Sequence, residues 1–206
     1  MPQKTALLGG TFDPIHIGHL NLAEGVCHAL GLDEVLFIPA GQPPHKPGVT
    51  PAHHRLEMVR QAVADNPSFA VSDLELQREG PSYTLLTLQA MRQQHPDDAL
   101  WWILGADALL GLHTWHQYQR FPDYVRFAVT PRPGVTLHSA RDLTVYLQQQ
   151  LPQFVGFCDW VDVPPLAVAS SDLRRTLAAG CGRYLLPAAV WRYIEAQALY
   201  LSAPEI

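Results

Sequence analysis

Lysine is scarce in this 206-residue chain, which has Lys4 and Lys46 against twelve arginines and a net charge of −5. Proteins that bind nucleic acid polymers depend largely on clustered cations. We therefore expect no nucleic acid polymer among the partners of this chain. Small anions remain compatible with its charge, and Lys46 is a candidate for binding one because it lies in a proline-rich segment.

Cysteines and long apolar runs are also few. Cys27, Cys158 and Cys181 are odd in number and widely spaced, which predicts reduced, mostly buried thiols rather than a disulfide framework or a metal site. No uninterrupted apolar run approaches about 18 residues, so we expect no membrane span. The first residues lack the apolar region and cleavage site of a secretory signal, which favours a cytoplasmic protein.

Apolar segments alternate with amphipathic ones along the chain. Strands are expected at residues 4–9, 34–39, 69–72, 99–105, 125–130 and about 160–163. Helices are expected at about 17–30, 51–65, 82–94, 139–150, 171–179 and 187–198. Strands that are apolar on both faces are typical of a parallel sheet covered by helices. We predict one α/β domain over residues 1–206, a Rossmann-like, doubly wound, mainly parallel sheet that binds ligands at the carboxyl ends of its strands.

The junction between the first strand and the first helix has the composition of a phosphate-binding loop. Residues 9–20 read GGTFDPIHIGHL. Glycines allow a sharp turn and a close approach to a ligand, and the free N–H groups at a helix start favour anions. The lysine of a Walker-type loop is absent, and His16 and His19 flank Ile17 and Gly18 instead.

Two imidazoles suit a reaction at a nucleotide phosphate. Imidazole can donate a hydrogen bond to a phosphate oxygen, and donors aimed at developing charge stabilise a transition state more than a ground state. A zinc pair is also compatible with histidines three residues apart. We disfavour it because no third ligand lies nearby in the sequence.

Two later segments are candidates for the same edge of the sheet. The first, AGQPPHKPGVTP at residues 40–51, contains His45 and Lys46 and is also compatible with a plain solvated connector. The second precedes a helix, which Ser170 or Ser171 would cap. Arg174, one turn into that helix, could join the cap in binding a phosphate. A cap without a ligand explains the segment as well.

These pieces together resemble a known family. Residues 9–19, Pro43-Pro44-His45-Lys46 and residues 171–174 resemble the nucleotidyltransferases with an HxGH motif and, within them, the bacterial nicotinate-nucleotide adenylyltransferases. The resemblance continues through residues 81–84, 105–107, 114–115, 132–134, 184–187 and 199–200, so it covers essentially the whole chain.

The resemblance implies transfer of AMP from ATP to the 5′-phosphate of nicotinate mononucleotide, with Mg2+ held mainly by the ATP phosphates and no covalent intermediate. It implies catalytic roles for His16, His19, Lys46 and Arg174, with His19 nearest the α-phosphate. It implies that ATP is bound by Gly9, Gly10, Thr11, Phe12, His16, Gly18, His19, His45, Lys46, Asp107, Ser171 and Arg174. The late helical region, about residues 171–200, would complete this ATP site.

The same resemblance places the mononucleotide on Thr11, Tyr83, Thr84, Trp115 and Arg132. Trp115 offers a flat apolar surface for the pyridine ring, and Arg132 offers a charge for its phosphate. Trp115 is also compatible with a core position and Arg132 with a free surface position. The late motif departs from the family, which usually has a threonine where Ser171 stands, and Asp172 adds a negative charge near the expected triphosphate.

Other readings remain open. Another adenylyl- or cytidylyltransferase, such as the phosphopantetheine enzyme, would not need Trp115, and a nucleotide-binding sensor would bind ATP without releasing pyrophosphate. Class I aminoacyl-tRNA synthetases are excluded because two lysines and 206 residues cannot supply their second loop and RNA-binding domains. The sequence leaves the oligomeric state undetermined.

Overall fold

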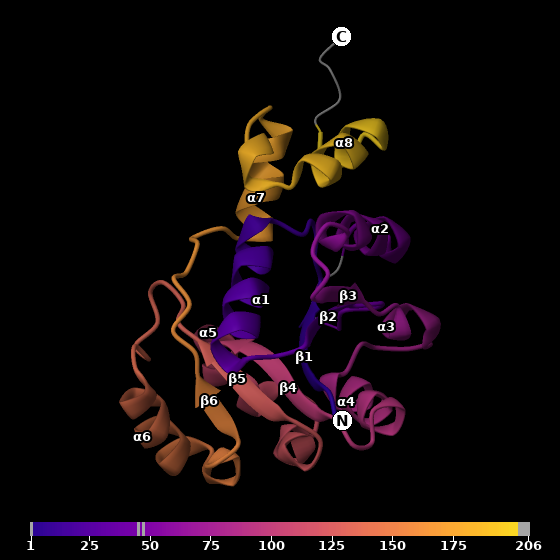
Figure 1. Cartoon of the computed structure of the whole chain (residues 1–206). Coiled ribbons are helices and arrows are strands. Elements are labelled where there is room, and N and C mark those ends of the chain that lie inside the picture. Colours follow the sequence, from indigo (N-terminus) through magenta and orange to yellow (C-terminus); the bar gives the residue numbers. More distant parts are fainter. Residues whose placement is uncertain (1, 45, 47, 202–206) are drawn as a thin grey trace.

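The computed structural model describes residues 2–44, 46 and 48–201. Its sheet has six strands in the order β3-β2-β1-β4-β5-β6, and every neighbouring pair is parallel. The strands are β1 (Lys4–Gly10), β2 (Glu34–Pro39), β3 (Phe69–Val71), β4 (Ala99–Gly105), β5 (Arg126–Thr130) and β6 (Cys158–Trp160). This arrangement confirms the predicted doubly wound α/β fold (Figure 1).

Six longer helices were predicted, and each of them begins and ends within two residues of the predicted positions. They are α1 (Ile17–Leu30), α2 (Ala52–Val63), α4 (Thr84–Gln94), α6 (Ala140–Gln150), α7 (Ser170–Ala178) and α8 (Ala188–Ala196). Shorter pieces were not predicted, because one turn of helix leaves little periodicity to detect. These are α3 (Leu74–Gln77), α5 (Ala106–Leu110), and the 3-10 helices η1 (Leu112–Thr114), η2 (Tyr118–Asp123), η3 (Pro152–Phe154) and η4 (Arg183–Leu185).

The sixth strand lies earlier than the predicted 160–163. Val161 still donates its N–H to the carbonyl of Val129, but the chain then turns, and Val163 N–H bonds to the carbonyl of Val161 at 3.0 Å. Val161 and Val163 are buried all the same, and Val163 packs closely beside Gly25 of α1. Burial by packing against a helix therefore produced an apolar pattern that resembles a strand.

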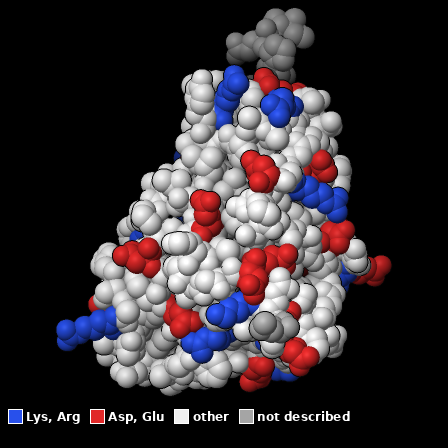
Figure 2. Space-filling model, viewed as in Figure 1, with Lys and Arg blue, Asp and Glu red and all other residues white. Residues whose placement is uncertain are grey.

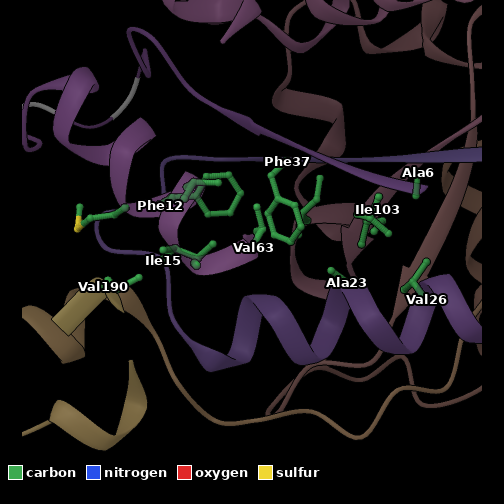
Figure 3. Close-up of a cluster of buried hydrophobic side chains, with 14 of the residues drawn as sticks. Ala6, Phe12, Ile15, Ala23, Val26, Phe37, Val63, Ile103 and Val190 are labelled. Atoms are coloured by element: carbon green, nitrogen blue, oxygen red, sulfur yellow. The ribbon is translucent and has the colours of Figure 1, made fainter. Parts of the chain in front are cut away.

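The sheet separates two hydrophobic clusters. Alternate residues of each strand point to opposite faces, so Ala6 and Leu8 enter one cluster and Leu7 enters the other. The first cluster includes residues of α1, α2, α7 and α8, and Figure 3 shows part of it. The second includes residues of α4, α5 and α6. Both faces are thus covered by helices, which leaves the carboxyl edge of the sheet for its loops.

The place for a ligand is set by the point where the order of the strands in the sheet reverses. β1 is the neighbour of both β2 and β4, and the chain leaves β1 toward α1 and β4 toward α5. Because all strands are parallel, the loops after β1, β2, β4, β5 and β6 meet at one edge. In doubly wound sheets this switch point is where ligands bind.

Three surface features complete the fold. The helices in the described part of the chain include none that is both long and apolar enough to cross a membrane. On the face in Figure 2, basic and acidic side chains are interspersed rather than gathered by sign. The three cysteines are free, as predicted, but the prediction of mostly buried thiols is wrong. Cys27 and Cys158 are half-buried and Cys181 is exposed, because each lies at the margin of the core clusters or beyond them.

Candidate functional site

The start of α1 brings the two histidines face to face. His16 is the N-cap residue in an extended conformation, and its ring stacks on that of His19 with centroids 3.7 Å apart. The backbone N–H of His16 donates to Nδ1 of His19 at 3.2 Å. Nδ1 of His19 is therefore an acceptor, so in the neutral ring the hydrogen lies on Nε2. The local cap fixes His19 as a donor through Nε2.

Burial keeps both imidazoles uncharged. The pKa of His16 is lowered to about 4, first by burial and then by the charge of Arg132. The pKa of His19 is lowered well below its ordinary value by burial, and electrostatic interaction with His16, Arg132 and Lys46 acts in the same direction. Neutral imidazoles can donate without adding fixed charge. Nδ1 of His16 is buried at the start of α1, beside Gly18.

The loop before α1 leaves backbone donors open. The N–H groups of Thr11 and Phe12 have no backbone acceptor among the described residues. Phe12 and Ile15 point into the hydrophobic cluster, near Val190 of α8 (Figure 3), and are almost fully buried. Anchoring these two side chains holds the loop in place.

Two glycines of the motif lie where a side chain would make close contacts. A Cβ at Gly9 would lie 2.4 Å from the ring of Trp102, and a Cβ at Gly18 would lie 3.0 Å from Nδ1 of His16. Gly10 is the last residue of β1. Gly9 therefore lets the Trp102 ring of β4 lie over the end of β1, and Gly18 lets the His16 ring lie against α1.

A buried carboxylate organises the loop. Asp13 is 3% exposed, and its oxygens receive the hydroxyl of Tyr200 at 2.5 Å and the backbone N–H of Thr50 at 3.3 Å. Arg174 donates through Nη1 to the Asp13 carbonyl at 2.6 Å and lies 3.6 Å from its carboxylate. We call Asp13, Thr50, Arg174 and Tyr200 the Asp13 network. It joins the β1–α1 loop to residues 40–51, which we call the proline loop, to α7 and to the end of the described chain.

Arg55 is a second organiser that sequence reasoning missed. Its guanidinium is fully buried and donates to the carbonyls of Thr50, Thr11 and Gly41 at 2.8, 2.7 and 3.2 Å. Burial lowers the pKa of this group, which the neighbouring charge of Asp13 partly offsets. The available signal was an arginine beside Leu56 and Met58 on the buried face of α2. A sequence pattern cannot show that three loop carbonyls surround it.

The predicted serine cap is wrong. Ala169 is the N-cap of α7 and makes no side-chain cap bond. Ser170 is already inside the helix, and its hydroxyl donates to the carbonyl of Pro14 at 3.0 Å. Because the Ser170 hydroxyl bonds to the β1–α1 loop, it does not cap α7. Ser171 is exposed in the first turn, and Asp172 pairs with Arg175 at 2.7 Å.

Several predicted residues converge on the histidines from other loops. Asp107 and Arg132 follow β4 and β5 and form an ion pair of 3.4 Å between half-exposed side chains. The charges of Arg132 and Lys46 both act on His19, and Lys46 itself is exposed. His45 lies outside the described residues.

A second group contains three of the residues expected to bind the mononucleotide, Tyr83, Thr84 and Trp115. The other two, Thr11 and Arg132, lie on the loops that follow β1 and β5. Tyr83 stacks on His116 with centroids 4.5 Å apart, and it is the N-cap of α4, whose first residue is Thr84. Trp115 is half-buried against Phe121. This group is joined to the proline loop, because Ser82 and Gln42 exchange two hydrogen bonds of 2.9 and 3.0 Å.

The chain is similar to known nucleotidyltransferases. The family model described as cytidylyltransferase-like matches residues 7–176. A probable nicotinate-nucleotide adenylyltransferase of Symbiobacterium thermophilum is 50% identical over 201 residues, 96% of this chain and 95% of the relative. A protein of the same description from Desulfitobacterium hafniense is 44% identical over 202 residues, 97% of this chain and 96% of the relative.

Solved structures share the fold. The nicotinic acid mononucleotide adenylyltransferase of Plasmodium falciparum complexed with NaAD superposes with a TM-score of 0.77 at 19% identity, covering 96% of this chain and 97% of that one. A structure described as the same Plasmodium falciparum enzyme complexed with APC gives a TM-score of 0.74 at 18% identity, with the same coverage.

Proposed function

Because the chain belongs to the cytidylyltransferase-like family and, within it, to the nicotinate-nucleotide adenylyltransferases, we propose how its residues carry out that reaction. The enzyme transfers AMP from ATP to the 5′-phosphate of nicotinate mononucleotide in NAD biosynthesis. An oxygen of the 5′-phosphate bonds to the α-phosphorus of ATP, the bond from that phosphorus to the β-phosphate oxygen breaks, and pyrophosphate leaves with the bonding electrons. The products are deamido-NAD and pyrophosphate.

His19 is the donor to the reacting phosphate in this proposal. The observation that carries it is the bond from His16 N–H to Nδ1, which leaves the hydrogen of the neutral ring on Nε2. A preorganised donor aimed at developing negative charge stabilises the transition state more than the ground state. His16, stacked on His19 at the same helix start, is the second phosphate ligand.

The remaining ATP contacts come from the loops around α1. Backbone N–H groups at Gly10, Thr11 and Phe12 approach the phosphates. Lys46, Ser171 and Arg174, together with His45, hold the β- and γ-phosphates, and Asp107 accepts from a ribose hydroxyl. The late helical region, about residues 171–200, thereby completes the ATP site within one nucleotidyltransferase domain. Support comes from the contacts of Arg174 and Ser170 with the β1–α1 loop.

The mononucleotide lies on the second group. Thr84 begins α4, and free N–H groups at a helix start favour the carboxylate of nicotinate over the neutral amide of nicotinamide. Tyr83 and Trp115 provide aromatic surface for the pyridine ring, Thr11 contributes its backbone, and Arg132 neutralises the 5′-phosphate. Alignment of the two anions can supply about 7 to 11 kcal/mol of the barrier.

The divalent ion enters with the nucleotide. In the described residues, no group of three or more histidine, cysteine, aspartate or glutamate side chains could hold a metal ion. We propose that Mg2+ is part of the ATP substrate, held mainly by its phosphates, rather than a resident cofactor.

We also propose a cytoplasmic enzyme whose partners are ATP and the mononucleotide, without nucleic acid polymers or membranes. Three free cysteines fit a reducing compartment, and the net charge of −5 disfavours polyanions.

A pyrophosphate-release assay with Mg2+ and ATP tests the function against three acceptors. We expect the highest kcat/KM with nicotinate mononucleotide, a lower value with nicotinamide mononucleotide and no release with phosphopantetheine. Equal efficiency with the acid and the amide would refute the role of α4. Binding of ATP without release for any acceptor would favour a nucleotide sensor.

A further inference from the structure

The end of the described chain reaches the phosphate-binding loop. Tyr200 is separated from Asp13 by 187 positions in the sequence, yet its hydroxyl donates to the Asp13 carboxylate at 2.5 Å. Ala198 and Tyr200 both have positive φ, 49° and 60°, a conformation that costs a residue other than glycine about 1–2 kcal/mol. The turn therefore keeps an unfavourable backbone that directs Tyr200 back toward the loop.

A buried carboxylate is unexpected in a site for anions, because its charge repels phosphate. Asp13 is nonetheless 3% exposed, so its partners must compensate for lost hydration. Those partners suggest that Asp13 positions other residues of the loop. Tyr200 and the Thr50 N–H occupy its carboxylate, and Arg174 lies at its carbonyl and 3.6 Å from the carboxylate.

The guanidinium of Arg174 is held at one edge, through Nη1. Nη1 faces Asp13, whereas Nε and Nη2 make no hydrogen bond that is found among the described residues, and 40% of the side chain is exposed. A guanidinium fixed in this way presents its other donors in one orientation. If the Tyr200 hydroxyl were removed, the carboxylate would be free to turn toward Arg174 and compete with a phosphate for it.

We propose that Tyr200 is a positioning residue for ATP, which acts through Asp13 to hold Arg174 ready for the triphosphate. This inference rests on the proposed function for the identity of the ligand. Tyr200 is not a catalytic residue, since it contacts Asp13 and not the reacting atoms. Burial and the bond to Asp13 raise the pKa of Tyr200, so the hydroxyl keeps its proton and stays a donor.

The test is a double-mutant cycle between Tyr200→Phe and Arg174→Ala. Tyr200→Phe keeps the ring and removes the hydroxyl. We expect about a five- to tenfold rise in the KM for ATP and in the Kd for a non-hydrolysable ATP analogue, the scale of one typical hydrogen bond. The kcat and the KM for nicotinate mononucleotide should change less than about twofold. In the Arg174→Ala background, Tyr200→Phe should change the Kd less than about twofold, since Arg174 is no longer there to position.

Tyr193→Phe is the matched control. Its hydroxyl lies 2.8 Å from Nδ1 of His54, where α8 packs on α2, and it is outside the Asp13 network. It removes a similar bond and should leave the Kd for the analogue unchanged, and the melting temperature of every variant checks that it is folded. Multiplicative effects of Tyr200→Phe and Arg174→Ala on the Kd, or an equal rise in Tyr193→Phe, would overturn the inference. Absence of pyrophosphate release by the unmutated enzyme would instead refute the proposed function, because the Kd cycle needs no turnover.

Discussion

At the scale of single residues, the site depends on histidines that are kept neutral. His16 and His19 stack at the start of α1, and burial lowers the pKa of each. A charged imidazole would bind phosphate more strongly in the ground state as well. A neutral donor with a fixed hydrogen gains most where charge develops, which is the condition for raising kcat.

His19→Ala should lower kcat by at least about a hundredfold while the fold is retained, because one preorganised donor is lost. His28→Ala is the matched control, since this exposed histidine lies in the last turn of the same helix. Steady-state kinetics and circular dichroism measure both. A kcat for His19→Ala close to that of the unmutated enzyme would remove His19 from the mechanism.

Stability should depend on pH through His16. Its pKa is about 4 in the folded chain and 6.5 ordinarily, so between these values the unfolded chain binds a proton that the folded chain does not. The free energy of unfolding therefore falls as pH falls below 6.5. Between pH 6.5 and 5 we expect the unmutated enzyme to lose about 1.5 kcal/mol more than His16→Gln. Urea unfolding of both proteins at the two pH values measures this, and equal losses would contradict it.

At the scale of elements, the ligand edge of the sheet lies where β1 and β4 are in close contact and the helices that follow them, α1 and α5, enter different hydrophobic clusters. Gly9 lies against the ring of Trp102, which is 4% exposed. The start of α7 stands over the start of α1 (Figure 1), joined to it through Ser170 and Pro14. The site is therefore formed where strands end and helices begin, and these ends are held together by a small residue or by a specific contact with a loop.

Gly9→Ala should destabilise the protein by about 1–3 kcal/mol, because the new methyl group would overlap the Trp102 ring. Gly111→Ala provides the comparison: Gly111 has a φ of −88°, and its Cβ would meet no atom closer than 3.8 Å. That change should cost less than about 0.5 kcal/mol. Chemical denaturation measures both, and similar losses would show that the contact with Trp102 has no effect.

At the scale of the whole molecule, two charged side chains join distant segments around the phosphate loop. Asp13 links it to residues 50, 174 and 200. Arg55 links it to the segment that follows β2. Neither link runs through the sheet, so the loops form a layer with their own interactions above the carboxyl edge.

Arg55→Met should lower the free energy of unfolding by on the order of 3 kcal/mol, since three part-buried carbonyls lose a charged donor at once. Arg60→Met, on the same helix, removes a half-exposed guanidinium 3.4 Å from Asp73. It should cost less than about 1 kcal/mol. The prediction fails if urea unfolding gives the two variants the same stability.

Much of the fold and part of the site could be read from the sequence. Regular elements were predictable because burial on both faces of a strand, and on one face of a helix, imposes a period on neighbouring residues. The β1–α1 loop was recognisable because glycine, proline and histidine at fixed spacing express local backbone and ligand requirements. β6 was displaced and the serine cap was wrong, because packing of Val163 on α1 and the bond from Ser170 to Pro14 are contacts between distant segments.

The sequence by itself determined the alternation of strands and helices, the position of the phosphate loop and the family. Tertiary structure alone decided that Arg55 is buried beneath that loop, that Tyr200 reaches Asp13, and that the pKa of both histidines is lowered. The physical reason is range. Periodicity and turn chemistry act between residues a few positions apart, whereas burial, charge and hydrogen bonding at the site depend on segments that meet only when the sheet and its loops are assembled.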